Sequence, residues 1–180
     1  MPDLVITLIG PDRPGLVEAV ATTVADHHGN WLEGRMAHLA GKFAGVLRAD
    51  VPPDKVDTVI GALRRLETRG LKIVAEAASP AGDPGDQRPM NLELVGLDRP
   101  GIVREISQLL AQQGVNVEEL TTDRSSAPMS GEMMFHARAR VHIPASADLA
   151  RLRSGLERLA NDLVVEIRLD SAPDHSGRPA

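Results

Sequence analysis

Two copies of one short motif contain the residues best suited to chemistry in this chain. GPDRPG occupies residues 10–15, and GLDRPG occupies residues 96–101. The proline is typical of the first position of a helix, because it has no amide hydrogen to lose there. Each motif is therefore expected to end a strand and begin a helix. The unpaired N–H groups at such a helix start favour an anion, for example a carboxylate.

Neither copy matches a nucleotide-binding loop. A phosphate loop continues with Lys and then Ser or Thr, whereas these motifs continue with Leu16-Val17 and Ile102-Val103. The dinucleotide fingerprint is also missing. Asp12 and Asp98 could meet the ammonium group of a ligand. They could equally cap the helix, in which case a purely structural turn explains the motif. The duplication does not separate these two alternatives.

The motifs belong to a longer internal repeat. Residues 8–33 align without a gap on residues 94–119 at an offset of 86, and 10 of the 26 positions are identical. Further along, Phe43, Arg48 and Pro52 match Phe135, Arg140 and Pro144 at an offset of 92. The second copy therefore contains a net insertion of six residues. We expect it in the segment TTDRSSAPMSGE, residues 121–132, as a longer loop.

Hydrophobic spacing predicts the elements that position the motifs. Leu4, Ile6 and Leu8 alternate as on a strand, and the residues after Pro14 switch to helical spacing. Residues 30–40 and 43–51 are expected to form a hairpin. Each copy reads strand, helix, strand, strand, helix, strand. This order is the ferredoxin-like βαββαβ plan of an α+β protein, with two helices on one face of an antiparallel sheet.

Composition then divides the chain into domains. We expect domains at residues 1–77 and 90–170, joined by a linker over residues 78–89 that is rich in Pro, Gly and Asp. Residues 171–180 have a similar composition and are expected to be a disordered tail.

Charge and aromatic content argue against direct binding to nucleic acid. The 180 residues include 20 Lys and Arg against 25 Asp and Glu, so the net charge of −5 has the wrong sign for neutralising phosphates. Trp31, Phe43 and Phe135 are the whole aromatic set, too few for a surface that stacks bases.

The sequence predicts neither a membrane protein nor a secreted one. No apolar stretch approaches the roughly 20 residues of a membrane span. The N-terminus lacks the basic leader of a secretory signal, and a cytoplasmic location is expected.

The sequence predicts no catalytic residue, no metal site and no cofactor. Without cysteine there is no thiolate ligand or cysteine nucleophile. No serine lies in a G-x-S-x-G setting. His136 and His142 share a strand face but are about 20 Å apart at roughly 3.3 Å per residue, too far to share a metal. We therefore expect a protein that is not an enzyme.

The repeated motif resembles the ACT domain. In both copies the D-R-P-G turn is followed, 18 positions after its Asp, by an Asn that opens the second strand: Asp12 to Asn30, and Asp98 to Asn116. The resemblance covers nearly all of residues 3–170. The tandem arrangement is similar to that of the glycine cleavage system transcriptional repressor family. The resemblance implies a sensor of a small molecule, most often an amino acid, bound where two ACT domains meet.

The resemblance also implies which residues bind the ligand. The polar residue before R-P-G and the Asn of the second strand contact it from opposing domains, and the turn amides receive its carboxylate. The implied ligand-binding residues are Asp12, Arg13, Pro14, Gly15, Leu16 and Asn30 in the first copy, and Asp98, Arg99, Pro100, Gly101, Ile102 and Asn116 in the second. The chain has Asp before R-P-G in both copies, where some serine-binding members have Asn, and Trp31 after Asn30, where a small aliphatic residue is usual.

The implied function is regulation without catalysis. The protein is expected to sense an amino acid such as glycine or serine, and to modulate a transcription factor through protein–protein contact. The alternative is an accessory subunit that controls an amino-acid metabolic enzyme allosterically. The partners are then a small molecule and a protein, which could be a DNA-binding regulator. The sequence leaves the oligomeric state open, although exposed sheet edges would let two copies pair side by side as a homodimer.

Overall fold

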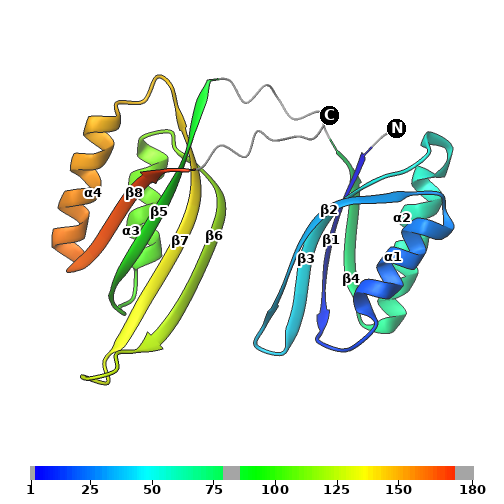
Figure 1. Cartoon of the computed structure of the whole chain (residues 1–180). Helices are drawn as coiled ribbons and strands as arrows, with labels where there is room; N and C mark the ends of the chain where they lie inside the picture. Colours follow the sequence, from blue (N-terminus) through cyan, green and yellow to red (C-terminus); the bar gives the residue numbers. More distant parts are fainter. Residues whose placement is uncertain (1–2, 79–85, 173–180) are drawn as a thin grey trace. The chain divides into compact units, whose positions relative to one another are not determined.

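The computed structural model describes residues 3–78 and 86–172, and the chain divides after residue 82 into two compact units (Figure 1). Each unit is a four-stranded antiparallel sheet with two α-helices on one face (Figure 1). The element order confirms the predicted α+β class and the βαββαβ plan.

In unit 1 the sheet has the order β2-β3-β1-β4, so the first strand is central. Its elements are β1 Asp3–Pro11, α1 Leu16–Asp26, β2 Asn30–Leu39, β3 Lys42–Asp50, α2 Val56–Arg65 and β4 Lys72–Ala77, with short 3-10 turns at Pro53–Lys55 and Leu66–Arg69.

Unit 2 repeats this plan with the sheet order β6-β7-β5-β8. Its elements are β5 Gln87–Leu97, α3 Ile102–Gln112, β6 Asn116–Ser126, β7 Met133–Pro144, α4 Leu149–Leu163 and β8 Val165–Ser171.

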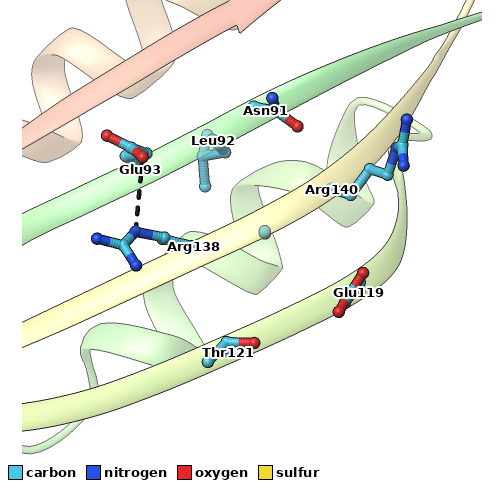
Figure 2. A pocket seen from close by; sticks show the side chains of 8 residues that line it. Asn91, Leu92, Glu93, Glu119, Thr121, Arg138 and Arg140 are labelled. Carbon is cyan, nitrogen blue, oxygen red and sulfur yellow. Dashed lines mark ion pairs between the residues drawn. The ribbon is translucent and has the colours of Figure 1, made fainter. Parts of the chain in front are cut away.

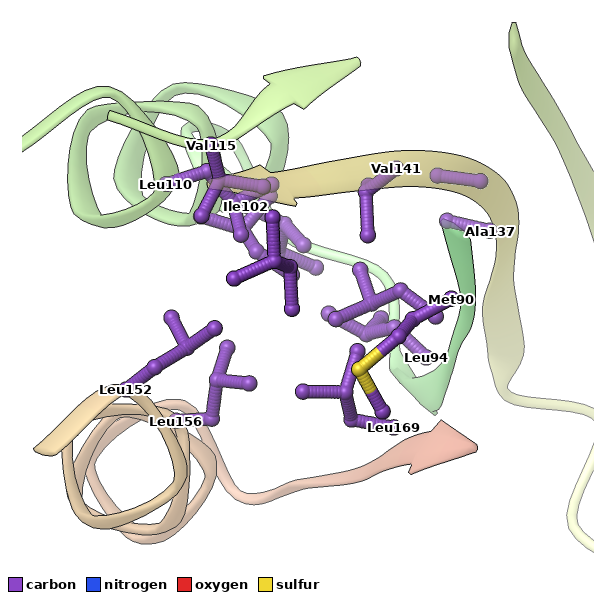
Figure 3. Packing of buried hydrophobic residues seen from close by; sticks show 14 residues of the cluster. Met90, Leu94, Ile102, Leu110, Val115, Ala137, Val141, Leu152, Leu156 and Leu169 are labelled. Carbon is purple, nitrogen blue, oxygen red and sulfur yellow. The ribbon is translucent and has the colours of Figure 1, made fainter. Parts of the chain in front are cut away.

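Each unit has its own hydrophobic core, built from the helix-facing side of the sheet. In β1 the residues Leu4, Ile6 and Leu8 are at most 1% exposed and pack with apolar residues of α1 and α2. In unit 2, β5 contributes Met90 and Leu94, which converge with leucines of α4 (Figure 3). The alternation along the central strand therefore decides which face of each sheet the helices cover.

The net insertion in the second copy lies mainly in a longer turn, as expected: residues 127–132 form the turn of the β6–β7 hairpin, where the β2–β3 hairpin has Ala40 and Gly41. Of residues 121–132, the first six continue β6, and the turn is confined to residues 127–132. The β6–β7 ladder runs as far as the pair Ser126 and Met133. Counted from the equivalent pairs His38–Phe43 and Arg124–Phe135, this ladder is longer by one pair than that of unit 1, and the other four added residues lie in the turn. Residues 121–126, expected as part of the loop, are therefore strand.

Two expected boundaries differ from the structure. Residues 87–89, expected in the linker, begin β5, because Gln87 and Pro89 lie opposite Pro144 and His142 of β7. Ser171, expected in the tail, is the last residue of β8 and pairs with Met90. The rest of the predicted linker and tail, residues 79–85 and 173–180, lies outside the described residues.

The β2–β3 turn holds a non-glycine residue in the left-handed conformation. Ala40 has φ 49° and Gly41 has φ 75°, and the flanking Leu39 and Lys42 pair with each other. Two residues with positive φ are typical of a type I′ hairpin turn, whose first central position favours Asn or Asp. Ala40 is therefore strained at this position.

We predict that Ala40→Asn stabilises unit 1. The left-handed conformation costs an ordinary residue about 1–2 kcal/mol, and Asn adopts it more easily, so we expect a gain of up to ~1 kcal/mol. Thermal unfolding followed by calorimetry measures the change. Ala37→Asn, in the regular part of β2, is the matched control and should not stabilise. Equal behaviour of the two variants would contradict the prediction.

Candidate functional site

The two predicted turns occupy the same place in both units, between the central strand and the first helix. Gly15 and Gly101 immediately precede α1 and α3, and both have positive φ, at 86° and 96°. L side chains rarely adopt this conformation. The glycine that ends each motif is therefore required by the backbone and sets the direction in which the helix leaves the turn.

Neither helix start is capped by a side chain within the described residues. No side-chain hydrogen bond occurs at the N-cap of α1 or α3. By contrast, α4 begins at Asp148, whose carboxylate accepts a hydrogen bond from the Arg151 N–H at 3.0 Å. Asp12 and Asp98 therefore do not act as helix caps. The N–H groups of the first helical turn, at the positive end of the helix dipole, therefore have no side-chain cap and remain available as donors.

Each turn aspartate instead lies against a basic side chain of the neighbouring hairpin. Asp12 Oδ2 is 3.6 Å from His38 Nε2, and Asp98 Oδ2 is 2.6 Å from Arg124 Nε. His38 and Arg124 are equivalent, because they lie opposite Phe43 and Phe135 in their strand ladders. In unit 2 the Arg124 guanidinium thus offsets the negative charge of Asp98. In unit 1 His38 occupies the equivalent position and forms an ion pair with Asp12 only when its imidazole is protonated.

The backbone holds this arrangement in register. The Asp12 N–H donates to the Gly41 carbonyl at 3.0 Å, and the Asp98 N–H donates to the Met133 carbonyl at 2.8 Å. The first turn is thereby bonded to the residue just before β3, and the second turn to the first residue of β7. These paired contacts explain how the same ion-pair position recurs although the hairpin of unit 2 is longer.

Sequence reasoning missed His38 and Arg124. The recognisable repeat stops at residue 33 in the first copy, and the alignment of a histidine with an arginine adds no identical residue that would extend it. The offset of 86 would nevertheless have paired them. The constant spacing of the repeat therefore indicated that the two positions are equivalent, whereas their residue types, His and Arg, did not.

The turn of unit 1 lines an open hollow of about 380 Å³. Its lining consists of the turn, the start of α1 and one aromatic residue of β3: Asp12, Arg13, Pro14, Gly15, Leu16, Val17, Glu18 and Phe43. Five of these are predicted site residues. The volume lies within the usual range of small-molecule sites. Arg99 and Pro100 of the equivalent turn in unit 2 are exposed, and Ile102 is buried under the sheet.

Asn30 and Asn116 do not join the turn of their own unit. Asn30 lies opposite Asp50, which in turn pairs with Asp3, whereas the turn follows Pro11 at the other end of β1. Asn116 lies opposite His142 in the equivalent position. Eight strand residues at about 3.3 Å each separate the two ends by roughly 26 Å. Trp31, beside Asn30, packs against the core of unit 1.

The polar contacts elsewhere in the described part of the chain do not assemble a metal centre. Ser125 Oγ lies 2.9 Å from His136 Nε2, and His142 Nε2 lies 2.8 Å from Glu118 Oε2, but both contacts are exposed. Across residues 3–78 and 86–172, no polar or charged residue is buried, and no group of three or more His, Asp or Glu side chains could hold a metal. In the same residues no helix has both the length and the apolar character to cross a bilayer.

Comparison with known proteins identifies the two units. Family models described as ACT domain match residues 2–76 and residues 84–166. The glycine cleavage system transcriptional repressors of Escherichia coli (strain K12) and Shigella flexneri are each 24% identical over 162 residues, covering 89% of this chain and 85% of theirs.

A solved structure supports the fold. The crystal structure of an unknown protein from Galdieria sulphuraria has a TM-score of 0.85 and 27% identity, covering 96% of this chain and 99% of that one. With both units matched, the chain belongs to the ACT-domain family, as two ACT domains in tandem, and is a relative of the glycine cleavage system transcriptional repressor.

Proposed function

We propose that this regulatory ACT-domain protein senses a small amino acid, such as glycine or serine, and modulates a transcription factor through protein–protein contact. The observation that supports it is the duplicated helix start that no side chain caps, with its aspartate beside a histidine in unit 1 and an arginine in unit 2. A cap-free helix start is suited to a carboxylate. The protein acts without catalysis and without a cofactor, and works in the cytoplasm.

The two ends of an amino acid find different partners at each turn. Its carboxylate accepts hydrogen bonds from the N–H groups of Gly15 and Leu16, or of Gly101 and Ile102. Its ammonium group meets the aspartate, which has acceptor capacity beyond its ion pair. Without a basic neighbour the aspartate would repel the carboxylate a few ångströms away. Arg124 offsets that repulsion in unit 2, and a protonated His38 would do so in unit 1, so Asp before R-P-G remains compatible with an anionic group.

The remaining site residues complete this proposal. Arg13 and Arg99 are exposed beside the turns and add positive charge for the carboxylate. Asn30 and Asn116 lie too far from the turn of their own unit to share its ligand. They would therefore contact a ligand that a different ACT domain holds.

We predict that a melting screen over the amino acids identifies the ligand, and that Asp98→Ala and Asn116→Ala abolish the shift. Ligand bound to the native state stabilises it by mass action, by about 2.7 kcal/mol at 100 times the dissociation constant. The unliganded melting temperature should change little, because the side chains of Asp98 and Asn116 are not buried.

Asp162→Ala is the matched control, since it removes an exposed aspartate from α4, away from the turn. It should keep the full ligand-induced shift. If none of the amino acids moves the transition of the unmodified chain, the sensor proposal loses its main support.

We predict that Arg124→Ala weakens ligand binding at unit 2 about 10-fold or more. The change leaves the negative charge of Asp98 unpaired beside the carboxylate of the ligand. The repulsion between the two carboxylates then weakens the binding free energy by of order 1 kcal/mol or more. Calorimetric titration with the amino acid found in the screen measures the affinity. Arg138→Ala removes an exposed arginine, paired with Glu93, from β7 of the same sheet and should leave the affinity unchanged. Partial recovery in Arg124→Lys would identify charge as the cause.

We predict that the protein alone does not bind DNA specifically at physiological salt. The net charge of −5 opposes contact with phosphates. Mobility-shift assays with the purified chain should be negative, and a shift should need the DNA-binding partner. A specific shift with the chain alone would contradict regulation through a partner. Co-purification with a metabolic enzyme whose rate then changes would favour the accessory-subunit alternative.

A further inference from the structure

The first turn of the helix differs in charge between the two candidate sites. Three positions after the turn glycine, α1 has Glu18 and α3 has Arg104. Glu18 Oε2 lies 3.6 Å from the position that a Cβ atom would take on Gly15. Arg104 Nη2 lies 3.5 Å from the corresponding position on Gly101. Beside the same backbone, unit 1 therefore places a carboxylate where unit 2 places a guanidinium group.

The residue beside the turn aspartate differs in the same direction. Arg124, whose Nε lies 2.6 Å from Asp98 Oδ2, keeps its positive charge at every pH that proteins normally meet. His38, whose Nε2 lies 3.6 Å from Asp12 Oδ2, is charged only when its imidazole is protonated. An imidazole changes its charge between about pH 5 and pH 8. Above that range unit 1 lacks a positive charge that unit 2 keeps.

The charged groups at the two turns have opposite excess above about pH 8, where an imidazole is neutral. Unit 1 has two carboxylates and one guanidinium group, from Asp12, Glu18 and Arg13. Unit 2 has two carboxylates and three guanidinium groups, from Asp98, Glu105, Arg99, Arg104 and Arg124. The two turns therefore differ by two unit charges, and unit 2 has the positive excess.

The face of the unit 2 sheet that the helices leave uncovered has no such excess in its ion pairs. Arg138 Nε lies 3.6 Å from Glu93 Oε1, beside an open hollow (Figure 2). Arg168 Nε donates to Glu166 Oε1 at 2.8 Å. Each of these arginines has its own carboxylate, whereas three guanidinium groups share two carboxylates at the turn. An anion therefore finds more unused donors at the turn than on the uncovered face.

Asp12 is the ionisable side chain within ion-pair distance of His38 in the described residues. On β3, the ladder partner of His38 is Phe43, which packs against the core, and Lys42 alternates onto the other face. From α1, Glu18 lines the same hollow as Asp12. Carboxylates ordinarily stay ionised above about pH 5. Protonation of His38 is therefore the change that alters the charge of this turn between about pH 8 and pH 5.

We propose that the two turns are unequal sites for the carboxylate of the ligand. The turn of unit 2 binds it more tightly above neutral pH, and the turn of unit 1 gains affinity as the pH falls and His38 becomes charged. The chain then fills its two sites in order as the ligand concentration rises. This inference rests on the proposed function, since it takes the ligand to be held at the turns.

Coulomb's law sets the expected size of both effects. In water, one unit charge about 6 Å from another changes an affinity roughly 3-fold at low ionic strength. Two charges therefore give unit 2 an affinity about 10-fold higher than that of unit 1 at about pH 8. Protonation of His38 adds one charge, so unit 1 should gain about 3-fold at about pH 5.5.

An NMR titration of the full chain with glycine, and separately with serine, measures the two sites one by one at low ionic strength. The Hα–Cα signals of Gly15 and Gly101 each report one turn. At about pH 8, the Gly101 signal should reach half of its shift at about 10-fold lower ligand concentration than the Gly15 signal. At about pH 5.5, the midpoint of Gly15 should fall about 3-fold, and that of Gly101 should stay unchanged.

Exchanging the charges of the helix starts tests the cause of the inequality. Glu18→Arg gives unit 1 the residue type of unit 2 and should tighten its site about 10-fold, whereas Arg104→Glu should weaken unit 2 about as much. Asp57→Arg is the matched control, because Asp57 is an exposed acid in the first turn of α2. It should leave both midpoints unchanged. Circular dichroism should show an intact fold in all three variants, because the side chains are exposed.

Substitution of the histidine tests the pH dependence. His38→Gln should abolish it, and His38→Arg should abolish it and also tighten unit 1 about 3-fold at about pH 8. His136→Gln is the matched control, since it removes a histidine of β7 that contacts Ser125 and not a turn. The pH dependence at Gly15 should survive in this variant.

The outcomes separate this inference from the proposed function. Equal midpoints at about pH 8, a pH dependence that survives His38→Gln, or a Glu18→Arg variant with an unchanged unit 1 midpoint would overturn the inequality and leave the sensor proposal standing. If neither glycine nor serine moves either signal at either pH, the sensor proposal is contradicted, and the inequality is overturned with it.

Discussion

The burial of one side of each central strand under two helices is the constraint on which the rest of the structure depends. Leu4, Ile6 and Leu8 in β1 occupy alternate positions and are almost fully buried, and β5 repeats the pattern. A period of two then points the intervening residues away from the helices. The same alternation therefore decides which residues form the core, where the turn after the strand begins, and which residues lie on the face that the helices leave uncovered.

The position of the turn follows from this packing. The first helix must return across the sheet, and a left-handed glycine at Gly15 or Gly101 makes the reversal without a side-chain cap. The turn aspartate is then held by a backbone bond to the hairpin and by a basic side chain of the second strand. A helix start that no side chain caps, beside a carboxylate that faces a histidine or arginine side chain, combines donors and an acceptor within reach of one small ligand.

Duplication preserved these constraints and relaxed others. The cores, the turns and their ion-pair positions correspond between the units, although His38 in one is Arg124 in the other. The sheet faces that the helices leave uncovered differ: Val46 and Val74 of unit 1 stand where unit 2 has Arg138 and Arg168. Core positions tolerate little change because packing is dense. A sheet face outside the core can diverge.

The sequence by itself determined the repeat, the βαββαβ order and the D-R-P-G turn, because hydrophobic period and turn chemistry act between near neighbours in the chain. Tertiary structure alone decided what lies across strands. It placed His38 and Arg124 on the aspartates, turned half of residues 121–132 into strand, and separated Asn30 from the turn. Each of these depends on the register of strands paired over long sequence separations. Register is set by the packing of whole faces, which local patterns do not specify.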